Sequence, residues 1–246
     1  MISIITVTKN SSETIGRAVQ SVMDQKKVEF EHIIKDACSD DETCAIAQEV
    51  NPSVFIVRKP DSGIYDAMNQ GVFAATGDIV SFLNSDDYYI DDYVLRDVVN
   101  AFNSGNYDFV YGNINMVSST GKILREWRTG VVDKADFLKG CQIPHPAFFC
   151  KKKMLDQIEI PFDASYKISA DLKQQLIMIN KMGARGKYID RVTTVMAMGG
   201  QSTQNISSYF RGWKECARAY SEVIGGNGWG FVFWKVLGKI KGIRGV

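Results

Sequence analysis

The sequence has almost no excess of charge of either sign and contains only two histidines. Its 29 basic and 28 acidic residues give a formal net charge of +1. Such a balance supplies no general electrostatic field for nucleic acid. We therefore expect no nucleic-acid partner, and a charged ligand has to be recognised by a local group of residues.

Cysteines are few, and their spacing indicates neither a disulfide framework nor a metal site. They are odd in number and lack the paired close spacing of a zinc site. The five are Cys38, Cys44, Cys141, Cys150 and Cys216. We expect ordinary thiols in a reducing cytoplasm.

The chain also lacks long apolar runs and a basic N-terminal leader. No stretch is long enough for a conventional membrane span. Met1 is followed directly by the apolar residues 2–7, without a basic lead or a cleavage site. We expect a cytoplasmic protein, and the inner face of the plasma membrane stays open as its location.

The first turn lacks a glycine-rich phosphate loop. Residues 8–12 are Thr-Lys-Asn-Ser-Ser, which weighs against a dinucleotide-dependent oxidoreductase, because that class uses glycines to approach the pyrophosphate. A sugar nucleotidyltransferase is expected to carry a similar loop, but it stays open as an alternative.

What is present is an alternation of strand and helix patterns in the first part of the chain. Short apolar, β-rich runs predict buried strands at residues 2–7, 30–35, 54–57 and 78–83. Apolar residues at helical spacing predict helices after Asn10, at 41–50 and at 64–75. Asn10 is predicted to cap the first helix together with Glu13. This alternation is typical of a nucleotide-binding α/β fold with a mostly parallel sheet.

The second half has a less regular pattern and is predicted to be α+β. Candidate strands lie at 109–111, 122–127, 187–189 and 193–198. A helix is expected after Asp171, and a loop is expected at 140–146. We predict one domain over 1–204, with a nucleotide-sugar-binding half at 1–112 and an acceptor half at 113–204. A helical extension is expected at 205–246.

Carboxylates follow two of the predicted strands. Asp36 comes after the second strand, and Asn84-Ser85-Asp86-Asp87 comes after the fourth. Ligands of open α/β sheets bind at the carboxyl ends of the strands. Asp36 is therefore expected to contact a base or ribose, and Asp86 a metal that bridges two phosphates. The alternatives are helix caps and a solvated acidic turn.

Four segments resemble family 2 glycosyltransferases. They are SIITVTKN (3–10), HIIKDACSDDET (32–43), DSGIYDAMNQG (61–71) and GDIVSFLNSDD (77–87). Their order and spacing carry the resemblance, and weaker similarity extends through Asp171 to residues 199–202. The resemblance implies a glycosyltransferase-A fold: a Rossmann-like, mostly parallel sheet flanked by helices. It also implies an inverting hexosyltransferase of the kind used in bacterial polysaccharide biosynthesis.

By this resemblance, a nucleotide diphosphate sugar, with UDP-sugar as the favoured donor, binds to residues along the strand ends. The implied donor-binding residues are Thr6, Val7, Thr8, Asn10, Asp36, Asp66, Asn84, Ser85 and Asp86. Asp86 is the implied ligand of Mn²⁺ or Mg²⁺. Asn84 stands where the family's Asp-x-Asp motif has its first carboxylate.

The acceptor is expected to be a glycan or a lipid-linked glycan. The resemblance makes Asp171 the catalytic base, although Ala170 stands where the family often has Glu. His145 is expected to bind the acceptor. Alternative roles are a helix cap for Asp171 and a structural hydrogen bond for His145. A noncatalytic carbohydrate- or lipid-binding module on a decayed transferase fold stays open as well, because of Asn84 and Ala170.

The C-terminal segment is rich in aromatic and basic residues. Trp and Phe side chains in 229–244 are expected at a bilayer boundary, with Lys235, Lys239, Lys241 and Arg244 facing anionic lipid. The alternative is a helix packed on the enzyme or on a second subunit of a homo-oligomer.

Overall fold

The structure is a computed structural model that describes residues 1–197 and 206–241. The weak similarity at residues 199–202 and the expectation for Arg244 lie outside these residues. The side chains of Lys239 and Lys241 also lie outside the described part.

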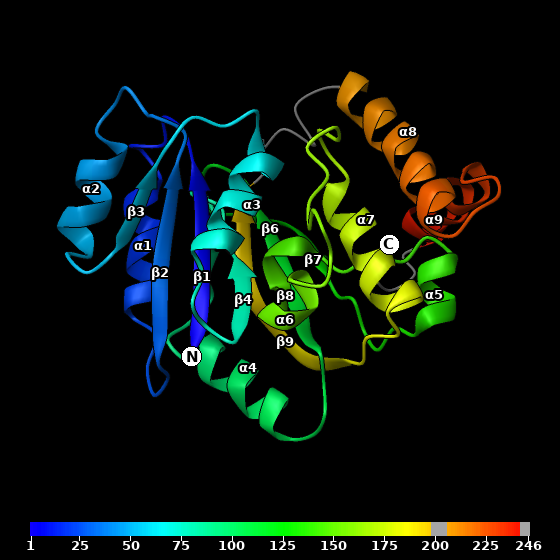
Figure 1. Ribbon diagram of the computed structural model, residues 1–246, viewed down its shortest axis with the longest axis horizontal. Coiled ribbons are helices and arrows are strands. Elements are labelled where there is room, and N and C mark those ends of the chain that lie inside the picture. Colours follow the sequence, from blue (N-terminus) through cyan, green and yellow to red (C-terminus); the bar gives the residue numbers. More distant parts are fainter. Residues whose placement is uncertain (198–205, 242–246) are drawn as a thin grey trace.

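A mixed sheet forms the centre of the molecule, with strand order β3-β2-β1-β4-β8-β6-β9-β5 and β7 paired to β6 (Figure 1). The strands are β1 (Ile2–Thr8), β2 (Phe30–Asp36), β3 (Phe55–Arg58), β4 (Ile79–Phe82), β5 (Tyr88–Tyr89), β6 (Phe109–Val117), β7 (Ile123–Trp127), β8 (Phe148–Lys151) and β9 (Gly186–Ala197). The helices are α1 (Ile15–Met23), α2 (Thr43–Val50), α3 (Ile64–Ala74), α4 (Val94–Asn103), α5 (Lys134–Leu138), α6 (Lys152–Leu155), α7 (Ala170–Leu176), α8 (Ile206–Val223) and α9 (Trp229–Lys241), with short turns η1 (His145–Ala147) and η2 (Ile177–Lys181).

The first half confirms the predicted strand and helix alternation. β1 pairs in parallel with β2 and β4, and β2 pairs in parallel with β3. Thr8 lies opposite Asp36 in the register of β1 and β2. The carboxyl ends of these strands therefore lie at one edge of the sheet, as ligand binding in α/β folds requires.

The start of the first helix differs from the prediction. α1 begins at Ile15, and Asn10 is in the left-handed region with a φ of 51°. The Asn10 side chain accepts a hydrogen bond from the backbone amide of Asp40 at 2.9 Å. Asn10 therefore links two loops at the edge of the sheet instead of capping α1.

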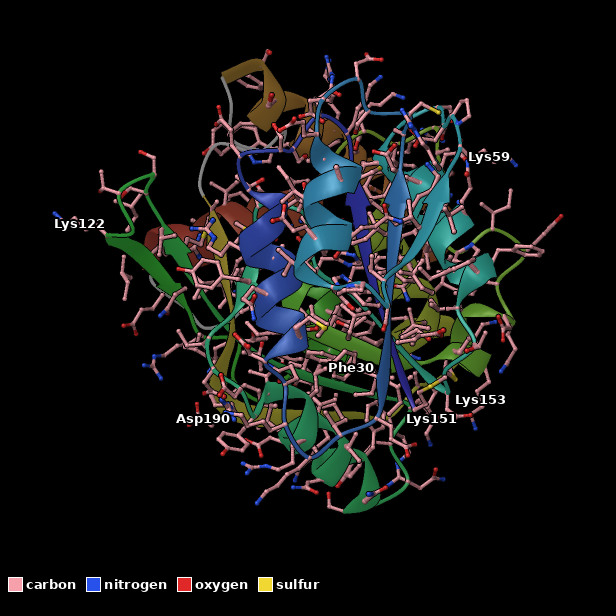
Figure 2. The ribbon with its side chains drawn as sticks, turned by 90° about the vertical axis from the view of Figure 1, so that its left-hand side faces the viewer. Phe30, Lys59, Lys122, Lys151, Lys153 and Asp190 are labelled. Carbon is pink, nitrogen blue, oxygen red and sulfur yellow. The ribbon has the colours of Figure 1, made fainter. Side chains whose placement is uncertain are left out.

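The second half contains a strand that the sequence pattern did not reveal. β8 inserts antiparallel between β4 and β6. The two strands predicted at 187–189 and 193–198 are one strand, β9, whose register against β6 shifts near Asn113. Figure 2 shows Lys122 projecting at the tip of the hairpin between β6 and β7, away from the body of the protein.

Helices cover both faces of the sheet, since alternate residues of each strand point to opposite faces. Ile4 packs with α4 on one face, whereas Ile5 packs with α3 on the other. The core on the α3 face continues into α7, α8 and α9. This continuous core holds the two halves of the chain together.

The C-terminal helices pack on the rest of the protein. α8 lies along α7, and α9 lies beside α8 (Figure 1). Phe231, Val232 and Lys235 are buried on one face of α9. The expectation that Lys235 meets anionic lipid is therefore wrong for this residue. Within 1–197 and 206–241, none of the helices has the length and apolar character needed to cross a membrane.

Candidate functional site

The loop after β4 places Asn84, Ser85 and Asp86 at the carboxyl edge of the sheet. Ser85 Oγ donates to Ser11 Oγ at 2.9 Å, and Arg17 donates to the backbone carbonyl of Asp86 at 3.0 Å. Arg17 also lies over the Tyr88 ring, 4.4 Å from its centroid. These contacts fix the β4 loop against the loop after β1.

A cavity of about 470 Å³ lies between these two loops. Its lining residues are Asn10, Ser11, Ser12, Glu13, Thr14, Asp41, Ser85 and Asp86. The structure thus brings together three of the predicted donor-binding residues, Asn10, Ser85 and Asp86. Several hydroxyl groups and carboxylates face the cavity, and they suit a polar ligand that carries a cation.

Two neighbouring carboxylates have raised pKa values. Burial raises the pKa of Asp86, and nearby Arg17 offsets part of this effect. Burial raises the pKa of Asp87 well above its usual value, and the charge of Asp86 adds to the rise. A bound cation would stabilise the ionised forms of both groups.

The remaining predicted donor residues on β1 and β2 lie beneath the surface. Thr6 is fully buried, and its hydroxyl is 3.0 Å from His32 Nε2. Val7 and Thr8 are also buried, and Thr8 Oγ1 has no hydrogen-bond partner. A nucleoside in the cavity would therefore meet the ends of these strands rather than the Thr6 side chain.

Asp36 is completely buried. Its carboxylate accepts hydrogen bonds from the Ser39 amide at 2.9 Å and from the Ser39 hydroxyl at 2.5 Å. Arg58 Nε lies 3.5 Å from the same carboxylate. Asp36 thus orders the loop after β2. A hydrogen bond to the nucleobase of a donor has to use the remaining lone pairs of this carboxylate.

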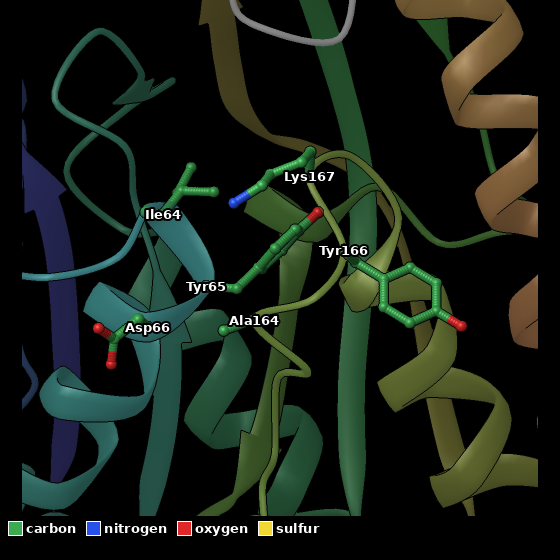
Figure 3. Close-up of a pocket in the computed structure, with 7 residues that line it drawn as sticks. Ile64, Tyr65, Asp66, Ala164, Tyr166 and Lys167 are labelled. Atoms are coloured by element: carbon green, nitrogen blue, oxygen red, sulfur yellow. The ribbon is translucent and has the colours of Figure 1, made fainter.

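Asp66 lines a separate, smaller cavity of about 150 Å³ beside the start of α3. Figure 3 shows the Tyr65 ring extending toward the loop with Lys167, while the Asp66 carboxylate points the other way. Hydrogen bonds from Ser62, led by its backbone amide, lower the pKa of Asp66. Asp66 therefore also stabilises the first turn of α3 as an internal acceptor.

Asp171 and His145, the two residues predicted for the acceptor site, lie near enough for the charge of Asp171 to act on the His145 ring. Asp171 lies in the first turn of α7, and its Oδ1 is buried without a partner. The His145 ring stacks on Phe82 with 5.0 Å between centroids, and neither ring nitrogen has a partner. Burial lowers the pKa of His145, and the charge of Asp171 opposes this shift. Unpaired buried polar atoms at one place favour a polar ligand there.

Three further residues complete this group and were not predicted. Burial raises the pKa of Tyr65 well above its usual range, and the Asp171 charge contributes. Gln142 Nε2 donates to Asp171 Oδ2 at 3.0 Å. Lys235 from α9 donates to Gln142 Oε1. Tyr65 adjoins the predicted Asp66, whereas no local pattern connects Lys235 with Asp171.

The residues around Asp86 fit a divalent cation that is shared with a phosphate ligand. Among the described residues, no three His, Cys, Asp or Glu side chains are grouped to hold a metal by themselves. Mg²⁺ and similar ions are commonly bound by one or two carboxylates together with substrate phosphates. Asn84, two residues before Asp86, does not line the cavity, but its Oδ1 is buried and without a partner.

Comparisons with known proteins agree with this architecture. A PGL/p-HBAD biosynthesis glycosyltransferase from Mycobacterium bovis is 33% identical over 176 residues, 70% of this chain and 66% of the relative. The present chain thus spans slightly less than two thirds of that relative's length.

Two solved structures share the fold. S. aureus TarS 1-349 in complex with UDP-GlcNAc has a TM-score of 0.65 at 20% identity, covering 80% of this chain and 58% of that one. The mannosyltransferase PcManGT from Pyrobaculum calidifontis, in complex with GDP-Man and Mn²⁺, has a TM-score of 0.69 at 16% identity, covering 95% and 68%. The predicted glycosyltransferase-A fold is confirmed. A sequence model described as Glycosyl transferase family 2 matches residues 3–157, more than half of the chain, and the protein therefore belongs to that family.

Proposed function

We propose that the protein transfers a sugar from a nucleotide diphosphate sugar to a hydroxyl group of a glycan or lipid-linked glycan. The observation that carries this proposal is the cavity at the ends of β1 and β4, which Asp86 lines. Family membership supports the reaction class. A cavity of about 470 Å³ falls in the range of small-molecule sites.

The donor is expected to lie with its diphosphate near Asp86. Asp86, with Asn84 Oδ1 as a second oxygen, is the proposed ligand of Mn²⁺ or Mg²⁺. When bound, the ion stabilises the charge that develops on the departing diphosphate. UDP-sugar is the favoured donor. Solved structures of the same fold hold UDP-GlcNAc in one case and GDP-Man in another, so the nucleobase of the donor is to be determined by binding experiments.

Asp171 is the proposed general base. Its unpartnered Oδ1 takes the proton of the acceptor hydroxyl as the acceptor oxygen forms a bond to the anomeric carbon. The bond between that carbon and the phosphate oxygen breaks, and its electron pair leaves with the diphosphate. Attack from the face opposite the leaving group gives inversion.

His145 is proposed to orient the acceptor. Because burial lowers its pKa, the ring is neutral near pH 7 and presents one donor and one acceptor nitrogen. Such a ring can hold a sugar hydroxyl next to Asp171. Phe82 and Phe162, whose rings contact His145, fix its orientation.

The mycobacterial relative is named for PGL/p-HBAD biosynthesis, which supports a biosynthetic role for the transferred sugar. Trp229, Phe233 and Trp234 are exposed on α9. Contact of this aromatic face with the inner surface of the membrane, or with a second subunit, stays a prediction.

A thermal-shift panel tests the donor class. UDP-glucose, UDP-N-acetylglucosamine, GDP-mannose and the free nucleotides are each added with and without Mn²⁺. Selective binding raises the unfolding temperature. A shift that needs both Mn²⁺ and a nucleotide supports the proposal, whereas no shift with any nucleotide favours the noncatalytic alternative.

A further inference from the structure

Lys235 is a buried cation in a helix whose opposite face is exposed. Its exposed fraction is 8%, against 53% for the adjacent Trp234. Among the described residues, its ammonium group forms hydrogen bonds but no ion pair. The Lys235 ammonium instead donates to Gln142 Oε1 and lies 3.7 Å from Cys216 Sγ. A buried ammonium without a charged partner is costly, which indicates a role beyond packing.

Two glycines hold α9 in the position that this contact requires. A Cβ atom at Gly140 would lie 2.5 Å from the backbone nitrogen of Lys235. A Cβ atom at Gly228 would lie 1.9 Å from the backbone oxygen of Ala217. Both approaches exclude any side chain, so the backbone around Lys235 is pressed against the loop that carries Gln142.

Lys235, Gln142 and Asp171 form a series of hydrogen bonds in which donation can run in only one direction. Lysine can only donate, so Gln142 must turn Oε1 toward Lys235. The amide nitrogen then faces Asp171 Oδ2 at 3.0 Å and requires an acceptor there. Asp171 Oδ1 is left buried and without a partner.

We propose that Lys235 is a positioning residue that acts through Gln142 to hold the Asp171 carboxylate with Oδ1 turned toward the acceptor hydroxyl. This inference rests on the proposed function, in which Asp171 is the base. Lys235 lies outside residues 3–157, which the family model matches. By this proposal the buried face of α9 contributes to the positioning of the base.

Donor hydrolysis with water as the acceptor tests the inference without knowledge of the natural acceptor. The probes are UDP-glucose, UDP-N-acetylglucosamine and GDP-mannose with Mn²⁺, and the readouts are kcat, KM for the donor and the unfolding temperature. The variants are Lys235→Met, which keeps the aliphatic stem, and Gln142→Glu, which keeps the shape but replaces the donor to Asp171. Trp234→Ala on the exposed face of α9 is the matched control.

We expect Lys235→Met and Gln142→Glu each to lower kcat by about 10- to 100-fold, because a misplaced base loses much of its effect. Donor KM stays within about twofold, because neither side chain lines the donor cavity. Trp234→Ala keeps the wild-type kcat. If Lys235→Met fails to fold, Gln142→Glu decides, since its shape is unchanged.

Asp171→Asn separates the two proposals. If Asp171→Asn is inactive while Lys235→Met or a folded Gln142→Glu has kcat within twofold of wild type, the positioning role is wrong and the proposed function stands. If Asp171→Asn is fully active, or if wild type hydrolyses no donor, the proposed function fails and this inference fails with it.

Discussion

Asp87 follows Asp86 directly in the chain, yet its carboxylate lies in the interior and accepts a hydrogen bond from the backbone amide of Ala197 at 3.2 Å. Its other oxygen accepts from Asn84 Nδ2 at 3.0 Å. Asp86 instead lines the cavity. Adjacent carboxylates are thus divided between a structural and a ligand-facing position.

Replacing each carboxylate by an amide distinguishes these positions. Asp87→Asn is expected to lower the free energy of unfolding by about 1–3 kcal/mol. The new amide nitrogen would face one of the two N–H groups that donate to the carboxylate, and that hydrogen bond would be lost. Asp86→Asn should change it by less than about 0.5 kcal/mol. Urea denaturation measures both values, and an equal loss in the two variants would contradict the division.

The buried histidine of β2 predicts an acid-dependent loss of stability. Burial lowers the pKa of His32 from 6.5 to about 3. Between these values the unfolded chain binds a proton that the folded protein does not, so the stability present above pH 6.5 is lost as the pH falls toward 3. The free energy of unfolding should fall by up to about 1.4 kcal/mol per pH unit from this group alone.

His32→Gln is the control for this slope. His145 and the lowered-pKa carboxylates contribute equally to both proteins, so they cancel in the difference. Urea denaturation at pH 5.5 and pH 4 should therefore show a smaller decrease for His32→Gln than for wild type. Identical decreases would mean that His32 is protonated in the folded protein.

Two glycines near the start of α9 test how closely this helix is docked. Gly228→Ala places a methyl group against the Ala217 carbonyl and should lower the free energy of unfolding by about 1–3 kcal/mol. A Cβ atom at Gly230 has no neighbour within 4 Å, so Gly230→Ala should stabilise the helix by up to about 1 kcal/mol. Thermal unfolding of both variants measures the two changes in stability, which should have opposite signs. Equal changes would contradict the close packing of α9 on α8.

The exposed aromatic face of α9 predicts association with lipid. The exposed fractions are 53% for Trp229, 59% for Phe233 and 53% for Trp234. Wild type should sediment with vesicles that contain anionic lipid, and the triple alanine variant should stay largely in solution. Wild type that remains in solution but elutes as a dimer would favour a second subunit on this face instead.

The sequence predicted the first half of the fold well, because its apolar runs and helical spacing are strong and local. It missed β8 because Phe148–Lys151 is a four-residue strand that pairs only with distant segments. β9 was predicted as two strands because Asp190 and Arg191 interrupt the apolar pattern, and Arg191 pairs with Asp91 and Asp97 of the neighbouring segment.

In the candidate site, too, local sequence patterns predicted some residues, whereas others meet only through long-range packing. Asp86, Asn10 and Ser85 follow predicted strands, so their meeting at one edge could be expected. Lys235 and Gln142 are 93 positions apart and meet only because α8 and α9 return to α7. The same packing turned the predicted lipid-facing Lys235 into a buried residue. Sequence periodicity shows which face of a helix is apolar but not which loop that face meets.

Manganese-dependent release of nucleoside diphosphate from the sugar nucleotides, compared between wild type and Asp86→Ala, decides whether Asp86 holds a metal that the transfer needs. We expect turnover by wild type that a chelator abolishes and that Asp86→Ala lowers by at least about 100-fold, because the charge on the leaving group is no longer stabilised. Turnover that persists without metal and is unchanged in Asp86→Ala would contradict this role of Asp86.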